Sequence, residues 1–232
     1  MTTVQDLGRY GYQSQGFSVA GVMDVRSFKI ANLLLDNPEN EAVLEITLIG
    51  PTLEFTSATI IAITGGDFQP TINGEPAPMY TALYMNKGDV LKFGSARTGS
   101  RGYIAFSSYL DIPVVMGSRC TNLKSGLGGF KGRKLEADDY IGFRIKRRYL
   151  PFFLSRKLDM DEFDQTEATL RVVMGPQDGM FSKQGIQTFL GSEYTVTNEF
   201  DRMGCRLEGP FIAPKAVSYT HLRAHETRHD LV

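Results

Sequence analysis

Polar and charged side chains gather near the N-terminus, ahead of the first predicted helix. Gln5, Asp6 and Arg9 lie close together, and Asp24 follows Gly21 at the start of a segment with helical apolar periodicity. A glycine-hinged segment before a helix can present backbone N–H groups to an anion, and an arginine can bind a carboxylate or phosphate through two parallel hydrogen bonds. These residues are candidates for binding an anionic substrate. The alternative for Asp24 is a purely structural role as the N-cap of the helix.

A second candidate is the basic, glycine-rich stretch at residues 126–133, GLGGFKGR. Such a loop can hold phosphate with its backbone amides, so the candidate phosphate ligands are Gly128, Gly129, Lys131 and Arg133. The stretch lacks the GK[ST] ending of a P-loop, and a flexible surface loop is the alternative. Arg119 lies just upstream among small polar residues. Its neighbour Cys120 has no histidine base, so we expect a buried structural thiol there.

Histidine is absent from the body of the chain, because His221, His225 and His229 all lie in the C-terminal tail. Their i, i+4 spacing would suit a metal-binding helix, but the tail is also compatible with a charged segment of no function or with a segment foreign to the protein. We therefore expect residues 215–232 to lie outside the functional domain and predict no metal site. Without histidine, catalysis must use carboxylates, Arg, Lys, Tyr, Ser or backbone amides, or be completed by a partner.

The charge balance of the 232 residues argues against several classes of partner. Lys+Arg 25 against Asp+Glu 26 gives a formal net charge of −1, which lacks the basic footprint of a nucleic-acid or anionic-membrane binder. No run approaches the roughly 20 apolar residues of a membrane span, and the polar N-terminus lacks the apolar core of a signal peptide. With 2 cysteines and no CxxC pair, a cytoplasmic location is the default expectation.

Apolar periodicity and turn residues predict a mainly β chain with a few short helices. Asp24 is a plausible N-cap for a helix that ends before Asn37-Pro38. Short strand-like runs separated by Gly, Pro, Asn and Asp then follow at 42–50, 52–56, 59–64, 80–85, 89–94 and 101–106. Strands at this density, with one early helix, favour a β-barrel with helical decoration over a doubly wound parallel sheet.

The second half of the chain follows a change in the sign of its charge. A predicted strand at 140–148 ends in a basic cluster, and an acidic run begins at Asp159, so we expect a linker over 151–168 between a first β module at 1–150 and a partial second module at 169–214. Within the second module the patterns predict a strand at 169–176, a short helix capped by Asp178, and two further strands.

The two halves also echo one another. LEITLIGP at 44–51 is similar to RLEGP at 206–210, and each follows a predicted helix. A duplicated module would place equivalent loops on both sides of a pseudo-twofold cleft. The alternative is that both are common strand-then-turn sequences.

Several motifs together resemble one family. TTVQDLGRYGYQ, GVMD-x2-S-x3-AN, LEITLIGP, GSR-x-T and GGFKGR resemble the C subunit of 5-oxoprolinase, a group also described as biotin-dependent carboxyltransferase or allophanate hydrolase subunit 2-like, and QDGMF and DRMGCRLEGP are similar to its second-half motifs. The resemblance runs from Thr2 to about Pro214. It implies tandem cyclophilin-like β-barrel modules, the second of them incomplete.

The resemblance also implies an activity and partners. With A-like and B-like 5-oxoprolinase subunits, such a chain would take part in the ATP-dependent opening of 5-oxo-L-proline to L-glutamate, as a hydrolase component that is inactive alone. One alternative is a carboxyltransferase component that uses biotin on a carrier and acts on urea or a similar amide. The other is a non-catalytic protein that binds a kinase inhibitor similar to the B subunit.

The resemblance carries residue roles onto this chain. It implies catalytic roles for Arg9, Asp24 and Arg119, nucleotide contacts from the glycine-rich loop, and substrate contacts from Gln5, Asp6, Asn32, Asp201 and Arg202. The chain departs from the family pattern at both ends, so we expect a missing first strand and C-terminal truncation. Cys120 and Cys205 stand where the family usually has a serine and an aromatic residue, so neither is expected to be catalytic.

Overall fold

The computed structural model describes residues 1–159, 169–200, 204–212 and 215. The chain divides into two compact units, Met1–Asp164 and Gln165–Val232, which are described separately. The linker expected over 151–168 stays a prediction, because residues 160–168 lie outside the described structure.

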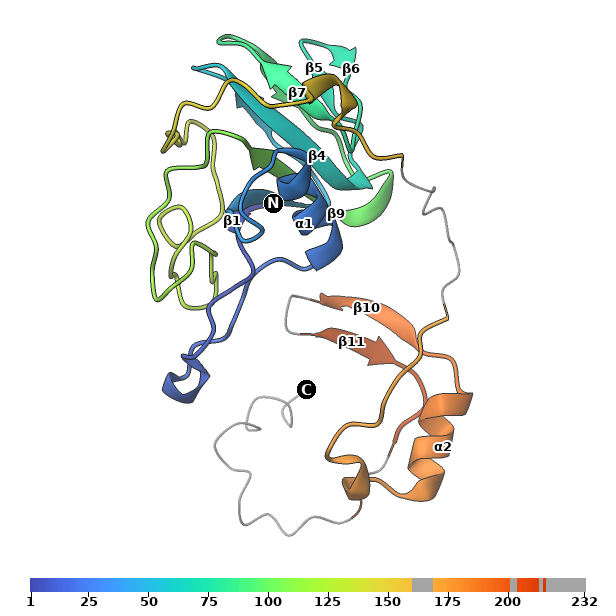
Figure 1. The fold of residues 1–232 in the computed structure, drawn as a ribbon. Helices are drawn as coiled ribbons and strands as arrows, with labels where there is room; N and C mark the ends of the chain where they lie inside the picture. The colour runs from blue at the N-terminus through green and yellow to red at the C-terminus, as the bar shows by residue number, and fades with distance from the viewer. Residues whose placement is uncertain (160–168, 201–203, 213–214, 216–232) are drawn as a thin grey trace. The chain divides into compact units, whose positions relative to one another are not determined.

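A five-stranded antiparallel sheet forms the centre of the first unit (Figure 1). Its order is β1-β2-β9-β4-β7, with bounds Thr2–Gln5, Val43–Thr47, Thr98–Phe106, Thr59–Asp67 and Ala82–Met85. Alternate residues of β4 point to opposite faces, so Ile61 and Ile63 join one apolar cluster while Ile60 and Ala62 join the other. The sheet is therefore buried on both faces. Strand β1 has no counterpart among the strands predicted from the sequence.

A smaller sheet covers one face of the central sheet. Its order is β3-β8-β5-β6, with bounds Thr52–Glu54, Val90–Lys92, Thr71–Ile72 and Glu75–Pro76. The larger apolar cluster joins Ile46, Ile63 and Ile104 of the central sheet to Phe55, Phe93 and Leu91 from or beside the smaller sheet. Each large aliphatic side chain buried in this way contributes roughly 1.5–3 kcal/mol relative to leaving it in water.

Helix α1, Val25–Leu34, covers the opposite face of the central sheet, over β4 and β9 (Figure 1). Phe28, Ala31 and the C-cap Leu35 are fully buried at helical spacing against that face. The predicted helix and its Asp24 cap are confirmed. A short 3-10 turn, Gln13–Gln15, lies in the segment between β1 and α1.

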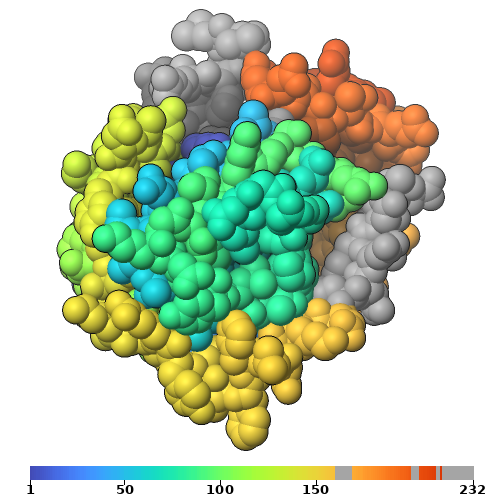
Figure 2. Space-filling view, turned by 90° about the horizontal axis from the view of Figure 1, so that it is seen from above, coloured from blue at the N-terminus to red at the C-terminus, as the bar shows by residue number. Residues whose placement is uncertain are grey.

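Irregular chain at 107–159 closes the edges of the central sheet. The backbone N–H groups of Thr121 and Leu135 donate to β1, at 2.9 Å each, and Lys157 forms a bridge with Thr81 beside β7. Segment 151–158, which includes a 3-10 turn at Phe153–Ser155, is thus bonded into the first unit. In the space-filling view, yellow atoms of this part of the chain border the cyan and green atoms of the sheets (Figure 2).

The strand predicted at 140–148 is wrong. This segment does run beside residues 107–111, and Arg144 N–H donates to the Tyr109 carbonyl at 2.9 Å. Tyr109, however, has a left-handed φ of 54°, which bends its segment and leaves only an isolated bridge between Leu110 and Phe143 instead of a ladder.

The second unit contains a 3-10 turn at Asp178–Met180, helix α2 at Lys183–Gly191, and an antiparallel hairpin of β10, Thr195–Phe200, and β11, Cys205–Glu208. The predicted cap is wrong, because Ser182 caps α2 and accepts from Gly185 N–H at 3.0 Å. The strand predicted at 169–176 is also absent from the described residues. Mainly β structure with few short helices is confirmed for the described residues, in open sheets that pack face to face.

Candidate functional site

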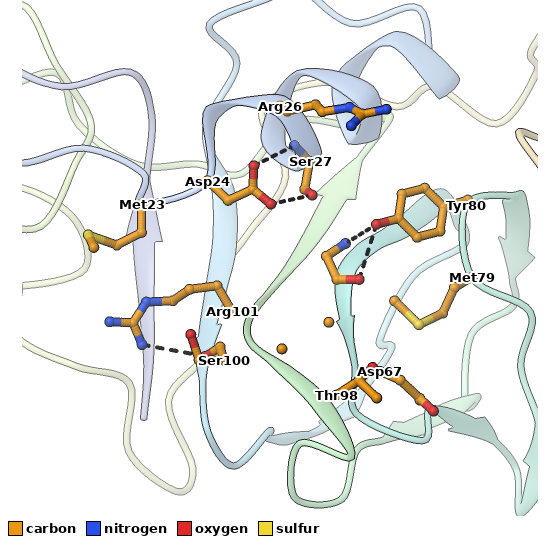
Figure 3. A pocket seen from close by; sticks show the side chains of 13 residues that line it. Met23, Asp24, Arg26, Ser27, Asp67, Met79, Tyr80, Thr98, Ser100 and Arg101 are labelled. Atoms are coloured by element: carbon orange, nitrogen blue, oxygen red, sulfur yellow. Dashed lines mark hydrogen bonds between the residues drawn. The ribbon is translucent and has the colours of Figure 1, made fainter. Parts of the chain in front are cut away.

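A cleft of about 670 Å³ opens in the first unit, beside the N-terminal end of α1. In Figure 3, Asp24 and Ser27 lie on the helix side, Arg101 and Met23 on another side, and Tyr80 and Met79 opposite them. The lining residues come from α1, β4, β9 and the approach to β7: Met23, Asp24, Arg26, Ser27, Gly65, Gly66, Asp67, Met79, Tyr80, Thr98, Gly99, Ser100 and Arg101. This volume suits a small-molecule ligand.

Asp24 is held by its role as the cap of α1. Its carboxylate accepts hydrogen bonds from the backbone N–H of Ser27, at 3.0 Å, and from the Ser27 hydroxyl. A carboxylate can accept about four hydrogen bonds, so capping leaves Asp24 with acceptor capacity toward the cleft. The structural and functional interpretations of this residue are therefore compatible.

A buried hydrogen-bond network fixes the turn that carries Asp24. The backbone N–H of Asp24 donates to the Tyr103 hydroxyl at 2.7 Å, and that hydroxyl donates to Glu45 Oε2 at 3.0 Å. The same Glu45 oxygen accepts from Met23 N–H at 2.9 Å. Burial, followed by the charge of Glu45, raises the pKa of Tyr103, so the hydroxyl stays protonated and able to donate.

Glycines let the strands beneath the cleft approach closely. A Cβ on Gly65 would lie 2.4 Å from the Arg101 carbonyl oxygen, and one on Gly66 would lie 2.4 Å from the Thr98 carbonyl oxygen. The ladder between β4 and β9 shifts register between Gly65 and Asp67, which is a β-bulge of the kind that often borders binding sites. Because the two glycines have no side chains, backbone atoms form this side of the cleft.

Substitution Gly66→Ala tests this close packing. The added methyl group would overlap backbone that cannot move without breaking the ladder, so we expect a loss of about 2 kcal/mol in the free energy of unfolding, measured by urea denaturation. Gly94→Ala is the matched control, because its Cβ would meet its nearest neighbour at an ordinary 3.6 Å. Equal stability of the two variants would contradict the packing described.

Tyr80 closes the side of the cleft opposite Arg101. Its hydroxyl lies 3.0 Å from Gly65 N and 3.1 Å from Gly65 O, as acceptor and donor respectively. The residue has a left-handed φ of 53°, an uncommon conformation for a bulky side chain. The tyrosine ring is thereby tied to the bulge.

The structure brings most of the other predicted site residues together in a second place, a clasp formed by residues 5–9, 115–121 and 126–129. The Asp6 carboxylate accepts from the Ser118 hydroxyl at 2.6 Å, from Arg119 N–H at 2.6 Å and from Gly8 N–H at 2.9 Å. Gln5 donates to the Thr121 carbonyl at 3.2 Å. Asp6 is only 2% exposed, so its bonds hold the clasp closed.

Arg9 lies inside this clasp and is fully buried. Its guanidinium donates to the carbonyls of Val115 and Cys120, at 3.2 Å each, and contacts the Cys120 sulfur at 3.6 Å. In the described residues, no carboxylate lies within ion-pair distance of it. Burial raises the pKa of the Cys120 thiol, which keeps that side chain in its unreactive form.

The glycine-rich loop packs against the clasp. A Cβ on Gly128 would lie 2.6 Å from an Arg9 nitrogen, and one on Gly129 would collide with the Thr121 side chain. Arg133 forms a two-bond ion pair with Asp139, at 2.7 Å for each bond, which lowers the pKa of Asp139 to about 2. Lys131 is exposed. The nucleotide-binding role of this loop stays a prediction.

The remaining candidates that the structure describes do not line the cleft. Arg119 is half-buried and donates from Nε to the Ile112 carbonyl at 3.0 Å. Asn32 lies in the C-terminal half of α1, is fully buried, and bonds to the Glu41 carbonyl and the Asn37 amide. Asp201 and Arg202 lie outside the described residues, as do the three histidines. Among the predicted site residues that the structure describes, Asp24 is therefore the one that lines the cleft.

Sequence reasoning missed the rest of the cleft. The residue types of Gly65, Gly66 and Asp67 indicate a turn between strands, whereas these residues form the bulged end of a nine-residue strand. The adjacent glycines within an apolar-flanked run were the available signal for a bulge. Arg101 and Tyr80 carry no sequence pattern that marks them.

The fold is a β-rich domain with a cleft beside the N-terminal end of a helix. A family model described as carboxyltransferase domain, subdomain A and B, matches residues 15–226. The chain belongs to this family.

Two curated relatives show the range of proteins in which such sequences occur. The C subunit of 5-oxoprolinase from Escherichia coli is 33% identical over 215 residues, which cover 91% of this chain and 66% of the relative. The urea amidolyase of Lachancea kluyveri is 32% identical over 225 residues, which cover 90% of this chain and 12% of the relative. The chain thus spans about two thirds of one relative and a small part of the other.

A solved structure agrees with the sequence relatives. The crystal structure of the Kluyveromyces lactis urea carboxylase superposes with a TM-score of 0.78 at 29% identity, over 93% of this chain and 20% of that chain. In the part of this chain that the structure describes, no helix has both the length and the apolar character that crossing a membrane requires.

Proposed function

We propose that this chain is a component of 5-oxoprolinase that acts with A-like and B-like partner subunits to open 5-oxo-L-proline to L-glutamate at the expense of ATP. The observation that carries the proposal is the cleft, which combines the first turn of α1, the Asp24 carboxylate and the Arg101 guanidinium in a volume of about 670 Å³. A lactam that also bears a carboxylate needs both hydrogen-bonding groups for its amide and a cation for its acid.

The residues of the cleft suit the polarisation of an amide. The first backbone N–H groups of a helix have no partner within the helix, and the helix dipole favours negative charge there. Such donors would stabilise the oxyanion that develops when a lactam carbonyl is activated. Asp24 would accept a hydrogen bond from the lactam N–H and so fix the orientation of the ring.

ATP is a co-substrate in this proposal, and we assign most of its binding to a partner protein. In this chain, Arg133 of the glycine-rich loop is committed to Asp139, and the Gly128 and Gly129 backbones press against Arg9 and Thr121. These contacts leave little of the loop free to enclose phosphate.

A carboxyltransferase acting on urea or a similar small amide is the second candidate, because the urea amidolyase relative is as similar in sequence as the 5-oxoprolinase relative. Such an enzyme would require biotin on a carrier. Urea has no carboxylate, so in this candidate the acid that Arg101 could meet would be the carboxyl group carried by biotin.

The deciding experiment measures ATP-dependent glutamate release from 5-oxo-L-proline by this chain mixed with its cognate A-like and B-like partners. We expect release only when all three proteins are present, since the glycine-rich loop of this chain is occupied by contacts within the chain. Release by the two partners without this chain would contradict the proposal. Transfer of a carboxyl group from carboxybiotin to urea, without glutamate release, would favour the second candidate.

A further inference from the structure

Arg101 has an incompletely satisfied guanidinium. Its Nε atom is buried and has no hydrogen-bond partner among the described residues. The hydrogen bond that its Nη1 donates to the Ser100 carbonyl is long, at 3.5 Å. A buried donor without an acceptor destabilises the folded chain, so an acceptor supplied by a ligand would recover this loss.

No acid of the chain neutralises Arg101 in the described structure. Among the described residues, Arg101 has no carboxylate within 4.0 Å. Three other arginines of the first unit do form ion pairs: Arg133 with Asp139, Arg144 with Glu41, and Arg147 with Asp36. Neither carboxylate of the cleft, Asp24 or Asp67, forms a described ion pair with Arg101, and they accept instead from Ser27 N–H and Gln69 N–H, at 3.0 and 2.7 Å. The positive charge is thus available to a ligand.

The backbone of Arg101 is fixed by its neighbours in the sheet, which sets the point from which its side chain extends. Arg101 pairs with Thr47 of β2, and its carbonyl lies against Gly65 of β4. In Figure 3 its side chain extends toward the side of the cleft on which Met23 lies. Arginine presents Nε and Nη as a planar pair of donors that matches the two oxygens of a carboxylate.

We propose that Arg101 binds the carboxylate of the cleft's ligand, so that the cleft selects small amides or lactams that bear a carboxylate over neutral ones. This inference rests on the proposed function for the nature of the ligand, but it concerns binding by this chain alone. Asp24 and the first turn of α1 would then meet the amide, while Arg101 would meet the acid on a different side of the cleft.

The experiment compares two probes that differ only by the carboxylate, 5-oxo-L-proline and 2-pyrrolidinone. Titrations of the full chain near neutral pH, followed by NMR, give a dissociation constant for each probe. We expect the wild type to bind 5-oxo-L-proline about 10- to 100-fold more tightly, the range that one charge-assisted bidentate contact supports. Arg101→Gln should abolish this preference without weakening the binding of 2-pyrrolidinone.

Arg97→Gln is the matched control, because Arg97 is exposed, directly precedes β9 and does not line the cleft. It should retain the full preference. Arg101→Lys should recover part of it, since lysine restores the charge but not the paired donors. Equal affinity of the wild type for both probes, absence of binding, or a preference that survives in Arg101→Gln would each overturn the inference.

The outcomes separate this inference from the proposed function. Carboxylate-dependent binding without glutamate release in the three-protein assay would leave Arg101 with its role and remove the oxoprolinase activity. Glutamate release by a complex in which this chain does not distinguish the two probes would support the oxoprolinase activity and remove the proposed role of Arg101.

Discussion

Asp6→Ala is expected to lower the free energy of unfolding by about 3 to 5 kcal/mol, because it removes the acceptor of three hydrogen bonds in a place that water does not reach. The Ser118 hydroxyl and the backbone N–H groups of Gly8 and Arg119 all donate to this carboxylate. The charges of Asp6 and of buried Arg9 both act on Cys120. The variant would therefore also remove the negative charge that lies in the same region as the Arg9 guanidinium. Urea denaturation at neutral pH measures the change.

The control for this variant is Asp111→Ala, since Asp111 is exposed and its substitution should change stability by less than about 0.5 kcal/mol. Asp6→Asn should fall between the wild type and Asp6→Ala, because the amide keeps one acceptor but turns a donor toward other donors. If Asp6→Ala and Asp111→Ala were equally stable, the clasp would contribute nothing to the fold.

Tyr103→Phe is expected to cost about 3 kcal/mol at neutral pH and to weaken ligand binding in the cleft. The variant leaves Asp24 N–H without its acceptor and removes one of the donors to Glu45, and hydrogen bonds to a charged group contribute about 1.5–3 kcal/mol. Denaturation gives the stability, and titration with 5-oxo-L-proline gives the affinity. Tyr84→Phe, at a residue that is 43% exposed, should match the wild type in both.

The stability difference between the wild type and Tyr103→Phe should shrink as the pH rises above about 10, the ordinary pKa of tyrosine. Burial and Glu45 raise the pKa of Tyr103 in the folded chain, so above that pH the unfolded chain releases a proton that the folded chain keeps. The wild type then loses about 1.4 kcal/mol per pH unit that the phenylalanine variant does not lose. A constant difference across this range would show that the hydroxyl is not buried as described.

The helix and most of the strands of the first unit were predictable because their signals are local. Asp24 caps a helix whose apolar residues recur at helical spacing, and the runs at 59–64 and 101–106 carry enough β-branched and aromatic residues to specify strands. The same local signal failed at 140–148, where the alternation is present but the left-handed Tyr109 of the neighbouring segment interrupts pairing. Strand formation depends on the partner, which a single segment does not encode.

The site was predictable only in part, for a related reason. The polar residues that stand out in the sequence, Asp6 and Arg9 above all, are buried and bonded within the clasp. Arg101 does not stand out, because its importance comes from an acceptor that is missing from its surroundings. A high density of polar residues in the sequence thus marked the buried clasp as readily as it marked the candidate cleft.

The residues that line the cleft all fall between Met23 and Arg101, within the first unit. A binding site encoded in one continuous stretch can be inherited by gene fusion without being divided. The relatives fit such a history, since the matching region makes up 66% of a separate protein in one and 12% of a large polypeptide in another. Under the proposed function, recognition of the small molecule would pass on intact while the sequence around the cleft, and with it the reaction, changes.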